Sequence, residues 1–133
     1  MHKLAQTLLL TGTAVAALAP ATAHAATPRT TTALLGTYDF GRAAVIGEAG
    51  RAAGVWSSYS VRSGIAGDDL TITYPPHSQA RPVEKQVYTA YFDQVDDAWS
   101  ECEQAGTEGI ARKVWVSYRC RTGFAPSYTL FVR

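Results

Sequence analysis

The chain has 133 residues, of which 47% are hydrophobic, 11% aromatic and 17% charged. These proportions suit one globular domain and exclude a disordered chain, a coiled coil or a collagen-like repeat. Twelve Lys and Arg residues against eleven Asp and Glu residues give a formal net charge of +1. Such a balance argues against a protein that binds duplex nucleic acid or an anionic membrane surface.

The segment 1–25 has the pattern of a secretory signal peptide. Lys3 supplies a basic start, an apolar stretch follows as far as Leu18, and Ala23-His24-Ala25 provides the small residues that a signal peptidase recognises. The apolar stretch is too short and too rich in Ala, Thr and Gly for a membrane span of about 20 residues. We therefore predict cleavage after Ala25, a mature domain of residues 26–133, and a secreted, extracellular protein without stable membrane insertion.

The mature part of the chain contains an internal repeat. Residues 47–66 align with residues 106–125 and are identical to them at ten of twenty positions, and the shared residues include a tryptophan and a tyrosine in the same register. Self-similarity of this kind indicates a duplicated structural unit. We expect repeat one to span about 28–74 and repeat two to span 87–133, with a proline-rich connector at 75–86 that cannot form a central strand.

The first repeat predicts a strand, a helix and a β-hairpin in that order. A weak opening strand covers about residues 30–35, and helical spacing of apolar residues covers about 41–53. The hairpin pairs residues 55–62 with residues 69–74. Repeat one therefore has the order β-α-β-β.

The second repeat shows the same order more clearly. Residues 84–92 are rich in β-branched and aromatic side chains and predict a strand. Apolar residues at helical spacing follow, and the aspartates within 93–97 suit the N-cap and the positive end of the helix dipole. Residues 113–121 alternate in polarity as one strand of a hairpin, and residues 128–132 return as the last strand.

Two such units predict an α+β fold made of pseudo-symmetric β-α-β-β repeats. The simplest arrangement is an antiparallel sheet with both helices packed on one face, while two separate sheets or exchanged strands remain open. Glycines at a spacing of three occur in both predicted helices, and we expect them to end the helix or to let it approach the sheet closely. These glycines are Gly47, Gly50, Gly106 and Gly109.

Cys102 and Cys120 are the two cysteines of the chain. In an exported protein an even pair indicates a disulfide rather than a metal site. The bridge would close a loop of about 18 residues and contribute about 3 kcal/mol in the chain-entropy model. The alignment of the repeats places Ala43 and Val61 at the positions that correspond to the two cysteines, so we expect these two side chains to lie in contact in repeat one.

Few residues of the mature chain suit catalysis or metal binding. His77 would be the only histidine left after cleavage, it lies in the proline-flanked connector, and no G-x-S-x-G motif is present. One histidine and two bonded cysteines do not make a usual zinc site. Glu101 and Glu103 are expected on the solvent side of a helix, which does not favour a pair of catalytic carboxylates. We predict no cofactor, no metal and no catalytic residue, and a hydrolase is the least favoured function.

The outer face of the two hairpins is the first candidate binding surface. The alternation of the strands places tryptophan, arginine and hydroxyl side chains on one side, and tryptophan and arginine are enriched in interfaces. The alternative interpretation is that the tryptophans form a second layer of the core. The candidate binding residues are Trp56, Arg62, Trp115, Arg119 and Arg121. The partner would be an extracellular protein, a glycan or a second copy of the chain in a homodimer, and not a nucleic acid.

The connector offers a second hypothesis, in which the protein inhibits an extracellular protease or another secreted enzyme. Residues 75–82 are braced by prolines and carry His77 and Arg81. Pro82 directly follows Arg81 and would hinder cleavage there by a trypsin-like enzyme. An ordinary linker of this composition would have the same sequence features.

The pattern Cys102-x3-Gly106-x2-Gly109-x5-Trp115-x2-Tyr118-x-Cys120, ending in the strand 128–132, resembles a group of uncharacterised small secreted proteins of actinobacteria. Those proteins carry an Ala-rich leader and a helix that is bridged to a Trp/Tyr hairpin. The resemblance implies secretion and a disulfide, and it carries over no activity and no functional residue. The prediction from the sequence is therefore a small secreted, non-enzymatic binding or interaction protein.

Overall fold

The computed structural model describes residues 16–19 and 29–133, so most of the predicted signal peptide lies outside the described residues. Six strands and two helices follow one another in the described part of the chain, in the order that both repeats predict. They are β1 (Thr31–Tyr38), α1 (Arg42–Ala52), β2 (Ser58–Ser63), β3 (Asp68–Tyr74), β4 (Lys85–Tyr91), α2 (Ala98–Ala111), β5 (Tyr118–Thr122) and β6 (Ser127–Val132).

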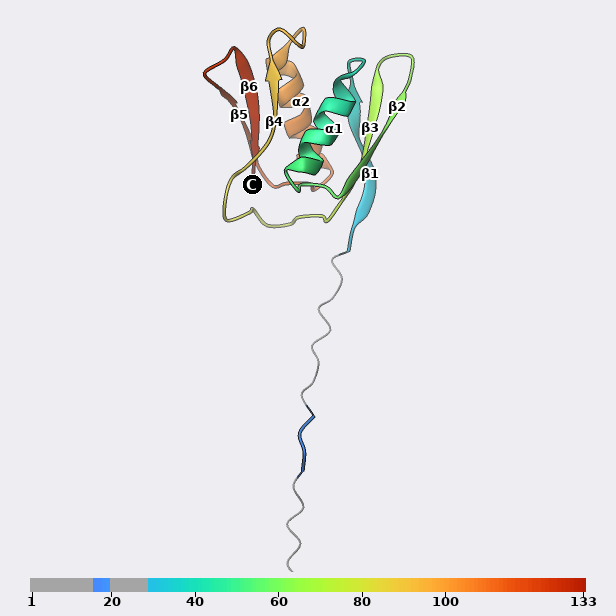
Figure 1. The fold of residues 1–133 in the computed structure, drawn as a ribbon, viewed down its shortest axis with the longest axis vertical. Helices are drawn as coiled ribbons and strands as arrows, with labels where there is room; N and C mark the ends of the chain where they lie inside the picture. The colour runs from blue at the N-terminus through green and yellow to red at the C-terminus, as the bar shows by residue number, and fades with distance from the viewer. Residues whose placement is uncertain (1–15, 20–28) are drawn as a thin grey trace, which may run out of the picture.

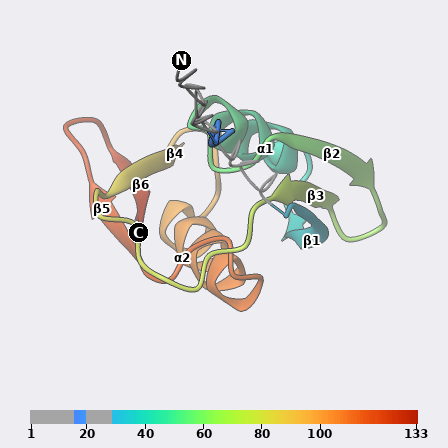
Figure 2. The ribbon, with the colours of Figure 1, turned by 90° about the horizontal axis from the view of Figure 1, so that it is seen from below.

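Each repeat forms its own three-stranded antiparallel sheet, with the strand order β1-β3-β2 in repeat one and β4-β6-β5 in repeat two. The two helices lie between the two sheets (Figures 1 and 2). The α+β class and the two β-α-β-β units are confirmed, and of the arrangements left open the chain adopts two separate sheets. Two sheets suit the helices because α1 also contacts β4 and α2 also contacts β1, so each helix buries a second side against the other repeat.

The strand pairing repeats in detail, which shows how the two units correspond. The ladder of β1 is interrupted by a bulge between Leu34 and Gly36, and that of β4 by a bulge between Gln86 and Tyr88. Leu34 therefore corresponds to Gln86. The difference in residue number between equivalent positions of the two repeats is thus smaller in the opening strands than in the hairpins. This offset changes because repeat two has a longer loop before its helix, and because α2 begins before Glu101, the residue that aligns with Arg42 at the start of α1.

The glycines of the helices permit very close packing against the hairpins, as predicted. A Cβ atom added to Gly50 would lie 1.8 Å from Cζ2 of Trp56, so only glycine leaves room for the indole ring. The indole Nε1 of Trp56 donates a hydrogen bond of 2.7 Å to the carbonyl oxygen of Gly47. In repeat two, Trp115 has the same relation to Gly109 and donates from Nε1 to the carbonyl oxygen of Gly106 at 2.9 Å.

The predicted strand at 113–121 is wrong in its first half, since β5 begins only at Tyr118. Lys113 has a φ of 60° and Gly54, its equivalent in repeat one, has a φ of 70°. These left-handed residues turn the chain back under the helix, where the backbone N–H of Val114 donates to the carbonyl of Gly109 at 2.8 Å. The residues between the helix and the strand therefore do not alternate between two faces of a sheet.

The helix of repeat two also starts later than the sequence pattern predicts. Asp97 is its N-cap and accepts a hydrogen bond from the backbone N–H of Ser100 at 2.9 Å, whereas Asp93 and Asp96 belong to the preceding loop. The position of Glu101 is a further correction, because this side chain is buried rather than on the solvent side of α2.

The disulfide is confirmed between Cys102 on α2 and Cys120 on β5, with a Cα–Cα distance of 6.1 Å. It ties the helix of repeat two to the edge strand of its sheet. In repeat one α1 contacts β2 and Ala43 is fully buried. The contact between Ala43 and Val61 stays a prediction.

Hydrogen bonds between side chains of α2 and residues of β1 join the two repeats. The Tyr38 hydroxyl donates to a carboxylate oxygen of Glu108 at 2.8 Å, and Gln104 donates to the backbone carbonyl of Thr37 at 2.8 Å. Burial, reinforced by the Glu108 carboxylate, raises the pKa of Tyr38 far above its ordinary value. Helix α2 therefore holds repeat one through polar contacts as well as apolar packing.

Candidate functional site

The two tryptophans of the candidate hairpin face are core residues. Trp56 is 2% exposed and Trp115 is 1% exposed, and both belong to the hydrophobic core. The alternative interpretation of a core position is thus the correct one, because the left-handed turn before each tryptophan directs its ring under the helix. Neither ring is available for contact with a partner of the folded protein.

The arginines of the hairpin face are exposed, but the structure separates them into two places. Arg62 lies on β2 and Arg119 and Arg121 lie on β5, on the two different sheets. Arg119 and Arg121 both pair with Glu84, at 2.5 Å and 3.5 Å. These ion pairs, chiefly the hydrogen bond from Arg119, lower the pKa of Glu84. The predicted residues therefore do not form one continuous binding face.

The connector packs against the end of α2 rather than standing free. The backbone N–H of His77 donates to the carbonyl oxygen of Lys113 at 2.8 Å, and Arg81 lies with Nη2 3.0 Å from Nε2 of His77. Burial, together with the charge of Arg81, lowers the pKa of His77. The Nη1 atom of Arg81 is buried with no hydrogen-bond partner in the described part of the chain. Residues 78–80 are exposed between these two contacts.

Four connecting loops gather at the end of the molecule that lies opposite the connector (Figure 1). We call this the loop end, and it comprises the β1–α1 loop, the β4–α2 loop and the two hairpin turns, at residues 39–41, 92–97, 64–67 and 123–126. Each loop carries an exposed large apolar residue. These residues are Phe40, Phe92, Ile65 and Phe124, of which Ile65 and Phe124 are fully exposed.

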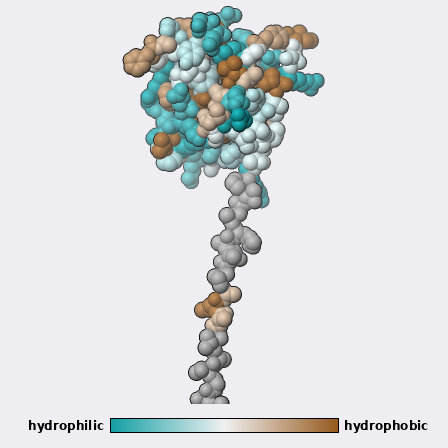
Figure 3. Space-filling view, viewed as in Figure 1, coloured by the Kyte–Doolittle hydropathy of each residue, from teal (hydrophilic) through white to brown (hydrophobic). Residues whose placement is uncertain are grey.

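The exposed apolar residues of the loop end form two pairs that the internal symmetry relates. Ile65 corresponds to Phe124 in the alignment of the two hairpins, and Phe40 corresponds to Phe92 in the alignment of the two opening strands. Apolar side chains stand out from both hairpin turns in the space-filling view (Figure 3). Both repeats therefore present apolar side chains at corresponding places.

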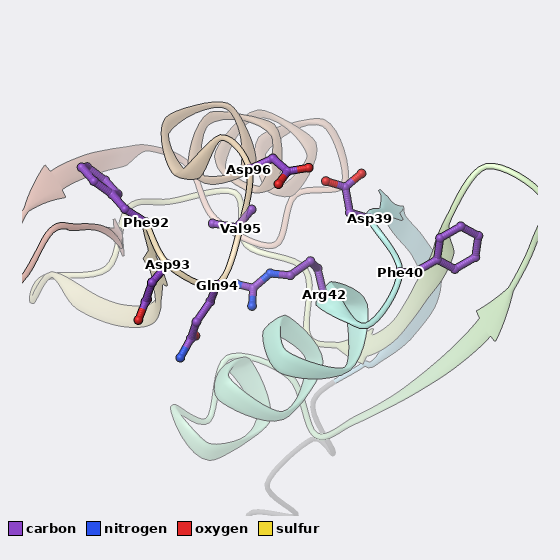
Figure 4. Close-up of a pocket in the computed structure, with 8 residues that line it drawn as sticks. All are labelled: Asp39, Phe40, Arg42, Phe92, Asp93, Gln94, Val95 and Asp96. Atoms are coloured by element: carbon purple, nitrogen blue, oxygen red, sulfur yellow. The ribbon is translucent and has the colours of Figure 1, made fainter.

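A pocket of about 460 Å³ lies between the β1–α1 loop and the β4–α2 loop (Figure 4). Phe40 and Phe92 line it at opposite sides, and the carboxylates of Asp39 and Asp96 point toward one another across it. The same two aspartates line a neighbouring pocket, which also reaches Glu101. The remaining lining residues are Arg42, Asp93, Gln94 and Val95.

Arg42 extends from α1 toward the β4–α2 loop and forms the inner wall of this pocket (Figure 4). Its Nε donates to Oε2 of Glu101 at 2.9 Å and its Nη2 donates to Oε1 at 2.8 Å, a two-pronged ion pair with both side chains buried. This hydrogen bonding raises the pKa of Arg42 against the opposing effect of burial. Arg42 aligns with Glu101 in the internal repeat, so the two residues occupy equivalent positions in the two helices.

Comparison with known proteins gives no relative: no protein-family model, no curated protein and no solved structure matches this chain. Within residues 16–19 and 29–133, no helix is both long and apolar enough to cross a membrane. The same residues contain no group of three or more His, Cys, Asp or Glu side chains placed to hold a metal ion. The features of the described residues that bear on function are therefore the exposed apolar side chains and the pocket of the loop end.

None of these loop-end residues is assigned to a site by the sequence alone. Asp93 and Asp96 are explained there as helix caps, and Phe92 as the end of a strand. The sequence offers one indication of the pair between Arg42 and Glu101. The two residues have opposite charges and occupy equivalent positions of the repeat, and equivalent residues can meet at the symmetry axis between two units. The signal for Phe40 and Phe92 depends on the separate offset of the opening strands, which only the strand pairing reveals.

Proposed function

We propose that this chain is an exported, non-enzymatic interaction protein that binds an extracellular protein through its loop end. The observation that carries the proposal is the set of four exposed apolar side chains, contributed in symmetry-related pairs by the four loops at one end of the molecule, two of which line an acidic pocket. Grouped exposed apolar residues with a polar surround are typical of protein-binding surfaces.

Two features support export. The leader at 1–25 has the signal-peptide pattern, and the disulfide between Cys102 and Cys120 is of the kind that persists in oxidising compartments. The resemblance to secreted proteins of actinobacteria is in line with both. Export to the medium is therefore the location that the proposal assumes.

Aromatic side chains support a contact role for the loop end. Phe92 packs against Tyr128 with ring centroids 5.5 Å apart, and Tyr128 packs edge-on against Trp99 at 5.0 Å, although Phe92 and Trp99 are both about half exposed. Rings that are held in place lose little conformational freedom on binding, which favours them as anchors of an interface. The interaction surface that we propose thus combines rigid rings with protruding loop tips.

The experiment compares capture of partners from the extracellular medium of the producing cells. A loop-end variant carries Phe40→Ser, Ile65→Ser, Phe92→Ser and Phe124→Ser, and a matched control carries Val83→Ser, Ile110→Ser and Val116→Ser at other exposed apolar positions. We expect the unaltered chain and the control to retain the same protein and the loop-end variant to lose it. Equal retention by all three chains, each with an intact circular dichroism spectrum, would contradict the proposal.

The inhibitor hypothesis has less support from the contacts of the connector. An inhibitory loop must offer a side chain to the specificity pocket of the enzyme, whereas Arg81 turns inward against His77 and buries its Nη1 atom. The exposed residues 78–80 lack a basic side chain. Assay against a panel of secreted proteases, with Arg81→Ala as the paired variant, tests this alternative directly.

A further inference from the structure

We propose that the chain forms a homodimer through strand β2, which pairs antiparallel with β2 of a second copy about a two-fold axis at Val61. The three-stranded sheets of the two first repeats then join into one continuous sheet. This contact lies on the side of the molecule and is independent of the proposed function of the loop end. Three features carry it: the unprotected edge of β2, the pattern of its free backbone groups and the placement of its charge.

In the described part of the chain the two sheets have four edge strands, β1, β2, β4 and β5. Bulges interrupt the ladders of β1 and β4, while β5 carries two arginines and is tied to α2 by the disulfide. Strand β2 pairs with β3 without a register shift, has Arg62 as its one charged residue and lies at the outer margin of repeat one (Figures 1 and 2). Bulges and charges protect exposed edges from pairing, so β2 is the edge that is open to a further strand.

The hydrogen bonding of the hairpin identifies the backbone groups on the free side of β2. The N–H of Gly64 donates to the carbonyl oxygen of Gly67 at 2.8 Å, so these two residues form a hydrogen-bonded pair. Such pairs alternate along antiparallel strands, so Arg62, two residues earlier, is also bonded to β3. The residues of β2 whose N–H and C=O groups face the free edge are therefore Tyr59, Val61 and Ser63.

A second copy matches these free groups when the two Val61 residues lie opposite one another. In this register Tyr59 of each copy lies opposite Ser63 of the other, and all three free residues donate and accept backbone hydrogen bonds across the contact. The Val61 side chain is 37% exposed, and its copy would cover it. The edge is thus self-complementary, as an interface on a two-fold axis must be.

The charges of β2 and β5 distinguish the two edges. In the β2 contact, Arg62 lies opposite Ser60 of the second copy, so no like charges face one another directly. The same contact made by β5 would place Arg119 opposite Arg121, and like charges directly opposite destabilise a strand pair. Moving the two-fold axis of the β2 contact from Val61 to Arg62 would oppose the two copies of Arg62. Charge therefore favours β2 over β5 and selects one register.

The geometry of the dimer determines where its loop ends lie. Each β2 leads into a hairpin turn of the loop end, and the paired strands run in opposite directions. The loop ends of the two copies therefore point away from each other. A dimer of this kind is bivalent and presents each loop end to a separate partner.

The test measures self-association of the purified ¹⁵N-labelled chain by sedimentation velocity at chain concentrations up to about 1 mM. We expect a reversible equilibrium between monomer and dimer, of low affinity because one pair of strands buries a small area. The backbone amide signals of residues 58–63 should shift with concentration, most strongly at Tyr59, Val61 and Ser63. A monomer at every concentration, or concentration-dependent shifts that leave these residues out, would overturn the inference.

Charge variants at Ser60, which is exposed, test the register without disturbing the core. Ser60→Arg copies Arg119 of β5 and opposes Arg62 of the second copy, so the dimer should dissociate about fivefold more readily. Ser60→Glu places a carboxylate opposite the same arginine and should tighten the dimer by a similar factor. The matched controls Ser117→Arg and Ser117→Glu make the same changes at an exposed position of repeat two and should leave the dissociation constant unchanged. Equal dissociation constants for the two Ser60 variants, or equal effects of the controls, would overturn the inference.

Discussion

The two repeats share one packing scheme but differ in how their polar side chains are used. Each has a helix that receives a tryptophan from the following turn at a glycine, and each has a bulged first strand. Repeat two adds a disulfide and sends Glu101, Gln104 and Glu108 from α2 into repeat one. At the place of Glu108, α1 has Ala49. The difference teaches that the duplicated unit became asymmetric at its interface, because Gln104 and Glu108 of α2 stand where α1 has the apolar Val45 and Ala49.

Removing Glu101 should have the largest effect on the free energy of unfolding, because Glu101 forms the buried ion pair with Arg42 between the two repeats. Glu101→Leu leaves the Arg42 guanidinium buried without its carboxylate, and breaking a buried pair typically costs about 3–5 kcal/mol of unfolding free energy. Urea denaturation of the single variant and of Arg42→Met with Glu101→Leu measures this. The double variant should recover most of the loss, and a double variant as unstable as the single one would contradict the account.

Making repeat two resemble repeat one at the disulfide should have the next largest effect. Cys102→Ala with Cys120→Val copies Ala43 and Val61 and should lower the free energy of unfolding by about 3 kcal/mol, because the unfolded chain regains the freedom of the closed loop. Thermal unfolding of the oxidised, reduced and substituted chains checks this. A substituted chain as stable as the oxidised one would show that apolar packing replaces the bridge fully.

Adding a methyl group at the equivalent helix glycines tests whether the shared packing is equally tight. Gly50→Ala and Gly109→Ala each place a Cβ within about 2 Å of an indole ring atom, and such overpacking costs about 1–3 kcal/mol. We expect similar losses in the two repeats by urea denaturation. A loss confined to one repeat would break the proposed equivalence, and Ala52→Gly on the exposed side of α1 provides a helix-propensity control.

The smallest effect concerns Tyr118 and high pH. Burial and the hydrogen bond to Glu103, 2.7 Å long, raise the pKa of Tyr118 to about 12. Because the folded chain holds the phenol proton more tightly than the unfolded chain, this contribution to stability is complete below about pH 10 and declines between pH 10 and 12. Ultraviolet titration should show a tyrosine transition at about pH 12 that Tyr118→Phe removes, while Tyr38 and Tyr88 titrate later still. Persistence of the transition at about pH 12 in that variant would contradict the assignment.

The elements of the fold could be predicted because the duplicated pattern of glycine, tryptophan and tyrosine constrains local structure. The number of sheets could not, since strand periodicity shows which faces are apolar and not which strands pair. The sequence left the tryptophans open between a binding face and the core, because Lys113 is left-handed, a conformation that its residue type does not predict. Pairing between Arg42 and Glu101 is a tertiary contact, so their equivalence in the repeat, and not the composition around either residue, is the sequence feature that could point to it.

The loop-end site was missed for a related physical reason. Its aspartates and phenylalanines are spread over two loops whose lengths differ, and only the packing of the two helices between the separate sheets brings the loops together. The sequence pattern explains all the aspartates within 93–97 as residues that cap a helix, and Asp97 does cap the start of α2. The neighbours Asp93 and Asp96 have the same chemistry and a different place in the fold.

The strand directions have a practical consequence for attachment. Strand β1 begins and strand β6 ends at the side of the molecule away from the four loops (Figure 1). A fluorescent protein fused after Arg133, or a surface anchor joined before Thr31, would therefore leave the loop end facing outward. The domain is suited to immobilisation on a sensor chip or to tandem display, and the sequences of its four loops could be randomised as in a binding scaffold without altering either attachment point.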